Sequence, residues 1–381
     1  MSHPLEGVRV LDLTRLLPGA TLTMMLADMG ADIIKIEDPI AGDYARWLGP
    51  KIDGQSVFFR MNNRSKRSVI INLKDEQGQT VLKKLAEQAD VLIEGFRPGV
   101  MARLGCDYDT LHAINPRLVY CSLSGWGATG PYAQDGNHDL NYVSMAGLPG
   151  AMETPQVLGG QIGDIGGAYA AMSGIMAGLF RRERAGEGAF IDISLSESAL
   201  PFSLYSWVEA MVLGVPGGQG TLTGGRACYR IYRTLDNKHV SLGALEEKFW
   251  RNFCEAVGRA DLIEDYTELD RQPFLIAELT TLFSKKTAAE WDEVLGEVDC
   301  CFTPVKNPAD IANDPHYQAR GMLGQFSDGT PWMRSPIHIN GSEPEPANVI
   351  PGYGEHTRTV LEEFGYSPTE IDALTATGAV K

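Results

Sequence analysis

The segment 136–142 holds the side chains best suited to proton transfer. In it, His138 lies next to Asn137 and Asp139, and Asn141 follows three positions later. Histidine changes its charge near neutral pH, and carboxylate or amide neighbours can orient its ring for acid–base catalysis. An isolated histidine more often has a structural role, but these polar neighbours leave the structural and the catalytic interpretation evenly balanced.

A second segment, 163–167, places Asp164 among glycines, directly before a helix predicted over about residues 165–184. An aspartate at the start of a helix is common, because its carboxylate caps the free backbone N–H groups there. Here the glycines also leave little side-chain bulk around the carboxylate and expose N–H groups at the positive end of the helix. Such a position suits a reacting carboxylate or the stabilisation of a developing oxyanion.

The third segment, 243–249, brings Glu246 to the point where a predicted strand ends and a helix begins. Acidic residues are favoured in the first turn of a helix, so this position has an ordinary structural explanation. By itself the segment gives only weak support for a catalytic carboxylate.

Positive charge is concentrated in the segment 60–67, which contains Arg60, Arg64, Lys66 and Arg67, although the chain as a whole carries a formal net charge of −16. The overall negative charge argues against a nucleic-acid partner, because neutralising phosphates requires a basic surface. The cluster itself is either a solvated charged face or a docking site for a polyanionic ligand. Composition and spacing leave both interpretations open.

Strands and helices alternate through the first half of the chain, which predicts an α/β fold with a doubly wound parallel sheet. The predicted strands are 8–13, 32–37, 68–73, 91–94, 118–123 and 189–194, and the predicted helices are 20–29, 77–89 and 165–184. The turn after the first strand, 16–20, lacks the GxGxxG pattern. We therefore expect no NAD site.

The length of 381 residues and the shift to glycine near residues 214–225 predict more than one domain. We expect residues 1–200 to form the first part of a large domain, 201–224 a linker and 225–325 a small α+β domain. Residues 326–350 would return as a second linker, and 351–381 would form a C-terminal helix that rejoins the large domain. Within the small domain, 229–242 predicts a hairpin with Asp236 and Asn237 at its turn.

Several other classes of protein are not expected. The N-terminus lacks the basic region and apolar stretch that are typical of a signal peptide. The longest weakly polar run, 166–180, is too short to span a membrane, and charged residues follow it directly. Six cysteines without a CxxC pair indicate neither a disulfide framework nor a zinc site. These features predict a cytoplasmic protein with reduced cysteines, no membrane contact and no metal.

Five further segments resemble, in chain order, the successive motifs of the class III CoA-transferase superfamily. They are 27–32, 92–100, 114–118, 124–127 and 354–357. The resemblance covers nearly the whole chain and implies a Rossmann-like large domain with a smaller α+β domain, in an interlocked homodimer. It further implies an active site between the large domain of one protomer and the small domain of its partner. The substrate would be an acyl-CoA thioester, with no cofactor beyond its CoA moiety.

Within this superfamily, the segments 136–142 and 244–246 resemble motifs of the α-methylacyl-CoA racemases. The resemblance implies epimerisation at C2 of a 2-methylacyl-CoA through an enolate, with His138 and Asp164 as the two bases. Glu246 of the partner chain would orient or charge the imidazole. Backbone N–H groups near Asp139, or at the start of the Asp164 helix, would hold the enolate oxygen.

A second activity is equally consistent with Asp164, because this position also matches the nucleophile of the transferases. The alternative is therefore a CoA-transferase that moves CoA between carboxylic acids through an aspartyl-CoA intermediate. A CoA-binding protein without catalytic activity is a third interpretation. Three features depart from the racemases: Asp38 where they have an arginine, the insert 42–46, and the segment 222–226.

The resemblance also implies a set of contacts with CoA. Phosphate contacts are expected from Arg64, Lys66 and Arg67, pantetheine and diphosphate contacts from Gly95, Phe96 and Arg97, and contacts near the ligand's entry from Arg103 and Leu104. It thereby favours the ligand-docking interpretation of the basic cluster.

Overall fold

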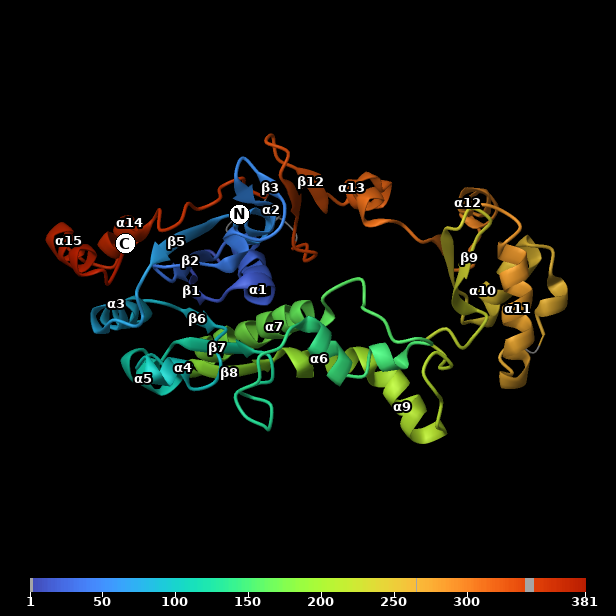
Figure 1. Ribbon diagram of the computed structural model, residues 1–381, viewed down its shortest axis with the longest axis horizontal. Coiled ribbons are helices and arrows are strands. Elements are labelled where there is room, and N and C mark those ends of the chain that lie inside the picture. The colour runs from blue at the N-terminus through green and yellow to red at the C-terminus, as the bar shows by residue number, and fades with distance from the viewer. Residues whose placement is uncertain (1–2, 265, 340–345) are drawn as a thin grey trace. The chain divides into compact units, whose positions relative to one another are not determined.

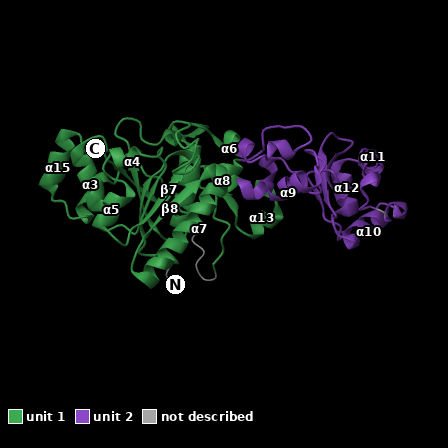
Figure 2. Ribbon diagram, turned by 90° about the horizontal axis from the view of Figure 1, so that it is seen from below, with its two compact units in different colours: residues 1–142, 161–199, 312–381 green, residues 143–160, 200–311 purple. Residues whose placement is uncertain are grey.

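The computed structural model describes residues 3–264, 266–339 and 346–381, and the chain divides into two compact units (Figures 1 and 2). Unit 1 is assembled from three separate stretches, Met1–Tyr142, Gln161–Ala199 and Ala312–Lys381. Unit 2 contains Val143–Gly160 and Leu200–Ile311. The predicted site residues His138 and Asp164 therefore both belong to unit 1, although the chain between them enters unit 2.

Unit 1 is built on a six-stranded parallel sheet with the strand order β5-β2-β1-β6-β7-β8. The strands are β1 (Arg9–Leu13), β2 (Asp32–Glu37), β5 (Lys66–Ile70), β6 (Val91–Glu94), β7 (Val119–Ser124) and β8 (Ala189–Ser194). Leu11 in the middle of β1 lies opposite Ile34 of β2 on one side and Leu92 of β6 on the other. The strand order reverses between β1 and β6, so these two strands form a topological switch point.

Helices cover both faces of this sheet, because alternate residues of each buried strand point to opposite faces. Val10 packs in the cluster with α1 (Leu16–Asp28) and α7 (Ile162–Ala185), whereas its neighbour Leu11 packs in the cluster with α3 (Glu76–Ala86), α5 (Tyr108–Ile114) and α14 (Thr357–Glu363). The result is a three-layer α/β/α arrangement (Figure 1). The parallel sheet and its helices confirm the α/β prediction for this part of the chain.

The glycines of α7 bring this helix unusually close to the sheet. A Cβ atom on Gly174 would lie 2.8 Å from Cγ2 of Ile191, and one on Gly178 would lie 2.9 Å from Cγ1 of Val119. Side chains larger than hydrogen at these positions would force the helix away from β7 and β8. Close packing within a core therefore explains the small residues in the weakly polar run 166–180. None of the described helices is long and apolar enough to cross a membrane.

The C-terminal segment completes the β5 edge of unit 1. Val380 forms an isolated antiparallel bridge with Ile71, just beyond the end of β5. The side chain of Thr357, at the start of α14, accepts a hydrogen bond from the backbone N–H of Ile70 at 3.1 Å. A further helix, α15 (Pro368–Thr377), follows with a capping box that Ser367 and Glu370 form.

Unit 2 contains a small antiparallel sheet in the order β11-β10-β9, with three helices packed against it. The strands are β9 (Tyr229–Arg233), β10 (His239–Gly243) and β11 (Phe302–Pro304), and the helices are α10 (Glu247–Ala256), α11 (Gln272–Phe283) and α12 (Ala288–Leu295). The predicted hairpin is present, and Asn237 at its turn has a φ of 60°, a left-handed conformation that asparagine adopts more readily than most residues. A helix, α9 (Leu204–Leu213), occupies part of the stretch 201–224 that we predicted as a linker.

Short elements fill the remaining described chain. In unit 1 they are the strand pairs β3 (Lys51–Ile52) with β4 (Gln55–Ser56) and β12 (Leu323–Gln325) with β13 (Pro331–Met333), and the helices α2 (Val57–Asn63), α4 (Val100–Arg103), α8 (Leu195–Ala199) and α13 (Pro315–Ala319). The helix α6 (Asp139–Met145) follows His138 directly. It therefore carries part of the predicted catalytic segment.

Candidate active site

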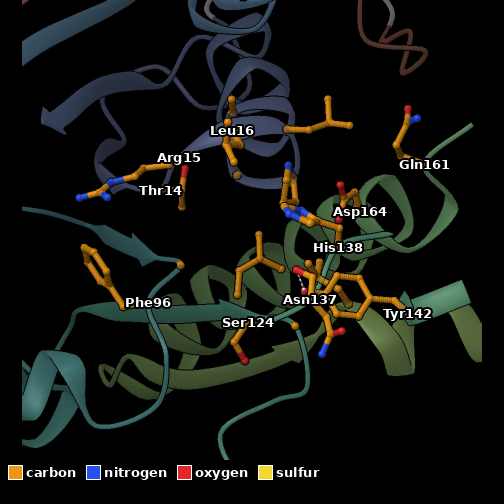
Figure 3. A pocket seen from close by; sticks show the side chains of 18 of the residues that line it. Thr14, Arg15, Leu16, Phe96, Ser124, Asn137, His138, Tyr142, Gln161 and Asp164 are labelled. Atoms are coloured by element: carbon orange, nitrogen blue, oxygen red, sulfur yellow. Dashed lines mark hydrogen bonds between the residues drawn. The ribbon is translucent and has the colours of Figure 1, made fainter. Parts of the chain in front are cut away.

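The predicted chemistry is concentrated at the switch point of the sheet. A cavity of about 600 Å³ is lined by residues 14–20, which follow β1, and by residues 95–98, which follow β6. Loops that follow β7 and the start of α7 add His138 and Asp164 to its wall (Figure 3). Crevices at the carboxyl ends of parallel strands, where the strand order reverses, are the usual ligand sites of open α/β sheets.

His138 lies immediately before α6 and is fixed through its backbone. Its N–H group donates to the side-chain oxygen of Asn141 at 3.2 Å, and its carbonyl accepts from the N–H of Asn141 at 2.8 Å. Asn141 therefore holds the main chain of His138, whereas we had expected its amide to orient the ring. The imidazole itself lines the cavity, close to Asp164 (Figure 3).

Tyr142 supports the loop that carries His138. Its hydroxyl donates to the carbonyl of Asn137 at 2.9 Å, and its ring packs edge-on against Trp126 with 5.3 Å between the ring centres. A Cβ atom on Gly125 would lie 2.4 Å from the tyrosine hydroxyl, so a glycine is required there. Tyr142 belongs to the motif 136–142, but its supporting role could not be predicted from the sequence, because Trp126 and Gly125 lie in another loop.

Asp164 lies in the first turn of α7 and faces the same cavity. Burial, together with the charge of Asp139, raises its pKa to about 6, and the charge of His138 opposes this rise. Since these charges act on one another, the three side chains form one electrostatic group. A carboxyl group with a pKa near 6 is present in both protonation states around neutral pH, so it can both accept and donate a proton.

Asp139 connects the two segments. Its carboxylate accepts a hydrogen bond from the backbone N–H of Asp164 at 2.9 Å. Gly163 allows this approach, because a Cβ atom there would lie only 3.2 Å from the same carboxylate oxygen. The Asp164 N–H, one of the backbone groups at the start of this helix, is thus already engaged by Asp139. We expected the glycine at 163 to leave the Asp164 carboxylate uncovered. It is also needed for packing, because a side chain there would lie against the Asp139 carboxylate.

The residues 95–97 line the cavity as expected for ligand contacts. Arg97 lies against the backbone of Gly136, where a Cβ atom would be only 2.4 Å from one guanidinium nitrogen. Arg103 and Leu104, at the end of α4, are not among the residues that line this cavity. Arg15 does line the cavity. It was not predicted from the sequence, because a single arginine after a strand has no distinctive spacing.

The structure places the predicted phosphate contacts of the basic cluster outside the wall of this cavity. Arg64 is buried and donates to both carboxylate oxygens of Asp28, at 2.9 and 2.7 Å. Lys66 is also buried and donates to Asn63 at 2.8 Å, and burial lowers the pKa of its amino group to about 7. Neither side chain lines the cavity, and both have partners within the fold.

Arg67 differs from these two in being partly exposed. It forms ion pairs with Asp32 and Glu363, at 2.5 and 2.6 Å, on the surface of unit 1. These carboxylates already neutralise its guanidinium, and it does not line the cavity. The spacing of the cluster in the sequence gave no sign of these two partners of Arg67, which lie 35 and 296 positions away.

Glu246 lies in unit 2, at the residue before α10. Burial and the charge of Glu246 raise the pKa of Cys301, so the carboxylate lies near this thiol. Its proposed action on the imidazole involves a second protomer and is taken up below. The described residues contain no group of three or more His, Cys, Asp or Glu side chains placed to hold a metal ion.

The sequence is similar over almost its full length to acyl-CoA enzymes of two kinds. It is 32% identical over 380 residues to a human protein named alpha-methylacyl-CoA racemase. This match covers 97% of this chain and 96% of the human protein. It is 34% identical over 374 residues to the acetyl-CoA:oxalate CoA-transferase of Acetobacter aceti, covering 95% of this chain and 96% of the relative. The two activities are thus matched at nearly equal identity.

The fold is shared with solved structures. A CAIB/BAIF family protein from Brucella suis superposes with a TM-score of 0.82 at 28% identity and covers 96% of this chain and 100% of that one. The family profile described as CoA-transferase family III matches residues 5–357. With the cavity at the switch point and the acid–base group in its wall, these matches lead to one conclusion: the chain is an enzyme of CoA-transferase family III, which acts on acyl-CoA substrates.

Proposed function

We propose that this enzyme is an α-methylacyl-CoA racemase, which epimerises C2 of a 2-methylacyl-CoA. One observation carries the proposal: the imidazole of His138 and the carboxylate of Asp164 line the same cavity and act on each other electrostatically. Inversion of a carbon next to a thioester carbonyl requires one base on each face, and an imidazole and a carboxylate are both side chains that serve as general bases.

In this mechanism one base removes the C2 proton, and the electrons move onto the thioester oxygen to give an enolate. The other base then returns a proton to the opposite face, so that the substrate is recovered with inverted configuration. The enolate oxygen would be held by the backbone N–H of Asp139, for which no described residue supplies an acceptor. A pKa of about 6 lets Asp164 serve in either direction near neutral pH.

The second candidate is a CoA-transferase, and the surroundings of the Asp164 carboxylate support it. Among the described residues, no side chain donates a hydrogen bond to this carboxylate, which leaves it available as a nucleophile. It would attack the thioester carbonyl and expel the CoA thiolate, giving a mixed anhydride. The thiolate would then attack the aspartyl carbonyl and release the first acid, leaving aspartyl-CoA for reaction with the acceptor acid.

We further propose that the enzyme is a homodimer, interlocked as the family resemblance implies, in which Glu246 of the partner chain acts on His138. The surface of α9 supports a partner. None of the residues of α9 is buried. The helix exposes large apolar side chains that include Trp207, Met211 and Leu213. An exposed apolar surface of this extent is typical of a protein–protein interface.

Proton exchange at C2 separates the two activities. The protein would be incubated in heavy water with a (2R)-2-methylacyl-CoA, and deuterium incorporation and optical purity would be followed. Exchange with epimerisation, lost in His138→Ala, is expected for the racemase. Transfer of CoA to added succinate without exchange, together with a hydroxylamine-trapped adduct on Asp164, would instead establish the transferase. Tight CoA binding without either activity would leave a non-catalytic binding protein.

A further inference from the structure

Arg15 is a cation of the cavity wall whose charge is not neutralised within the described chain. Its guanidinium donates to the hydroxyl of Tyr44 at 3.2 Å and lies over the rings of Tyr44 and Phe96, 5.3 and 5.8 Å from their centres. No described carboxylate lies within ion-pair distance of it. Two nearby cations behave differently: Arg46 pairs with Glu37, and Lys35 pairs with Asp43. Arg15 is therefore free to bind an anion.

Both peptide groups that flank Arg15 are held by buried charged side chains. The carbonyl of Thr14, before it, accepts from the amino group of Lys35 at 3.0 Å. The N–H of Leu16, after it, donates to the carboxylate of Asp43 at 3.1 Å. Charged partners make strong hydrogen bonds, particularly away from water. The orientation of the Arg15 backbone is thus fixed on both sides.

The two clamping residues form a buried ion pair beneath the turn. The amino group of Lys35 lies 2.9 Å from the carboxylate of Asp43, and both side chains are almost completely inaccessible to water. Leu16 has a φ of 60°, a left-handed conformation that is unfavourable for a leucine. A strained residue persists only where its surroundings impose the conformation, and the ion pair provides that constraint. Asp43 also accepts from the N–H of Ala45 and so fixes the turn that carries Tyr44.

We propose that Arg15 binds a phosphate group of the CoA moiety, and that the Lys35–Asp43 ion pair positions it for this contact. The inference rests on the proposed function as an acyl-CoA enzyme. Figure 3 shows the Arg15 side chain directed away from His138 and Asp164, toward the side of the cavity where Phe96 lies. In an acyl-CoA, the phosphates are separated from the reacting thioester by the pantetheine arm. A cation remote from the acid–base pair therefore suits a phosphate better than the acyl group.

Ligand binding tests the role of Arg15 without relying on turnover. Calorimetry would compare CoA with S-acetylpantetheine, which lacks all the phosphates, on the wild type, Arg15→Gln and the control Arg117→Gln, whose guanidinium pairs with Glu183 on the surface. A lost charge-assisted contact is expected to weaken CoA binding roughly 10- to 100-fold. Binding of S-acetylpantetheine, and of CoA to the control, should be unchanged.

Two outcomes would overturn the phosphate assignment. Equal CoA affinity in the wild type and Arg15→Gln would show that the residue makes no such contact. A loss that appears only with a dicarboxylic acyl group, on CoA and on pantetheine alike, would assign Arg15 to a carboxylate of the substrate. Failure of the wild type to bind CoA would instead contradict the acyl-CoA function on which the inference depends.

The role of the ion pair is tested by combining variants. Asp43→Asn keeps an oxygen acceptor but removes the charge, and it should weaken CoA binding because Arg15 is no longer held. In the double variant Arg15→Gln/Asp43→Asn the loss of CoA affinity should be no greater than in Arg15→Gln alone. Both substitutions remove the same contact between Arg15 and the phosphate, so their effects should not add. Additive losses, or full affinity in Asp43→Asn, would refute the positioning role.

A second variant covers the case in which Asp43→Asn does not fold. Leu16→Gly removes the penalty of the left-handed conformation, so the fold should be retained while the turn becomes freer. CoA affinity is expected to fall, because Arg15 is no longer held in one orientation, whereas the affinity for S-acetylpantetheine should change less. Unchanged affinity in Leu16→Gly would show that the fixed conformation of this turn is not needed for binding.

Discussion

The carboxylate of Asp139 accepts a hydrogen bond from the backbone N–H of Asp164 at 2.9 Å. This single contact joins the first turn of α6 to the first turn of α7, and so links the segment of His138 to that of Asp164. The same carboxylate raises the pKa of Asp164 through its charge. Asp139 therefore acts on Asp164 in two ways, by holding its backbone and by raising its proton affinity.

Replacing Asp139 by asparagine is expected to separate these two effects. The amide oxygen of Asp139→Asn can still accept from the Asp164 N–H, but the negative charge is gone, so the pKa of Asp164 falls. The acidic limb of the pH–rate profile should then move to lower pH, by roughly half to one pH unit. The measurement is the rate of C2 exchange between pH 4 and 8.

The matched control for this shift is Asp135→Asn. Asp135 also lines the cavity, but its charge is not among the influences on the pKa of Asp164. Its profile should coincide with that of the wild type. If the Asp139 variant kept the wild-type limb, the limb would not report the ionisation of Asp164.

Asp164→Asn is expected to abolish activity and to stabilise the fold at neutral pH. The pKa of Asp164 is raised from 3.8 to about 6 in the folded state, so folding there requires a charged form that the site disfavours. The cost is absent below about pH 4, grows as the pH rises to about 6, and is then constant at up to about 3 kcal/mol.

The free energy of unfolding, measured with urea at pH 4 and at pH 7, checks this prediction. The variant should gain stability over the wild type at pH 7 and little at pH 4. Asp107→Asn, at the cap of α5 on the other face of the sheet, is the control and should show no such gain. Destabilisation of Asp164→Asn at pH 7 would mean that the carboxylate contributes to the fold.

Arg64→Leu tests whether Arg64 stabilises the fold or contacts a phosphate of CoA. Removing the guanidinium leaves the buried carboxylate of Asp28 without its partner, which should cost about 3–5 kcal/mol in the free energy of unfolding. The affinity of the folded protein for CoA should change less than about twofold, because Arg64 does not reach the cavity.

Arg117→Leu provides the comparison, since its ion pair with Glu183 is exposed on both sides. Its loss should cost less than about 1 kcal/mol. A large fall in CoA affinity for Arg64→Leu at unchanged stability would restore the phosphate role that the sequence suggested.

The α9 surface gives a prediction about assembly. Met211 is 70% exposed, and Met211→Glu would place a charge in the middle of this apolar face. If a second protomer covers α9, the dissociation constant of the dimer should rise at least about tenfold, because burying an unpaired carboxylate is strongly unfavourable. Sedimentation over a range of protein concentrations measures this dissociation constant.

Leu269→Glu is the control for Met211→Glu. Leu269 is 71% exposed and lies elsewhere in unit 2, in a short 3-10 turn before α11. The Leu269→Glu substitution should therefore leave the dissociation constant of the dimer unchanged. A wild type that sediments as a monomer at all concentrations would contradict the proposed homodimer and, with it, the action of Glu246 across protomers.

The bounds of a strand could be predicted from the sequence where polar or turn residues follow its apolar residues. The predicted bounds of β2, β6 and β8 match the structure, because their sequences are short apolar runs with clear limits. Helix α1 begins at Leu16, four residues before the prediction, since Pro18 and Gly19 suggested a turn. Proline is tolerated in the first turn of a helix, and Gly19 is needed there because Thr14 packs against it.

The start of β5 was predicted two residues too late. The sequence Lys66-Arg67 suggested a charged surface, so the strand was predicted from Ser68, but β5 begins at Lys66. A buried lysine is recognised only by its partners, and Asp12 lies 54 positions earlier. The approach of His138 and Asp164 was foreseen through the motifs, whereas the cavity with Arg15 depends on contacts that no local pattern records.

The three-part composition of unit 1 bears on how the protein is made. Strand β8 ends at Ser194, but α14, which covers one face of the sheet with Val360 and Leu361, follows only after all of unit 2 has been synthesised. At typical translation rates this interval lasts on the order of ten seconds or more. During that time the apolar face beneath α14 and the unpaired edge of β5 are open to other chains. Newly made protein should therefore need protection by chaperones until the bridge between Ile71 and Val380 closes this edge.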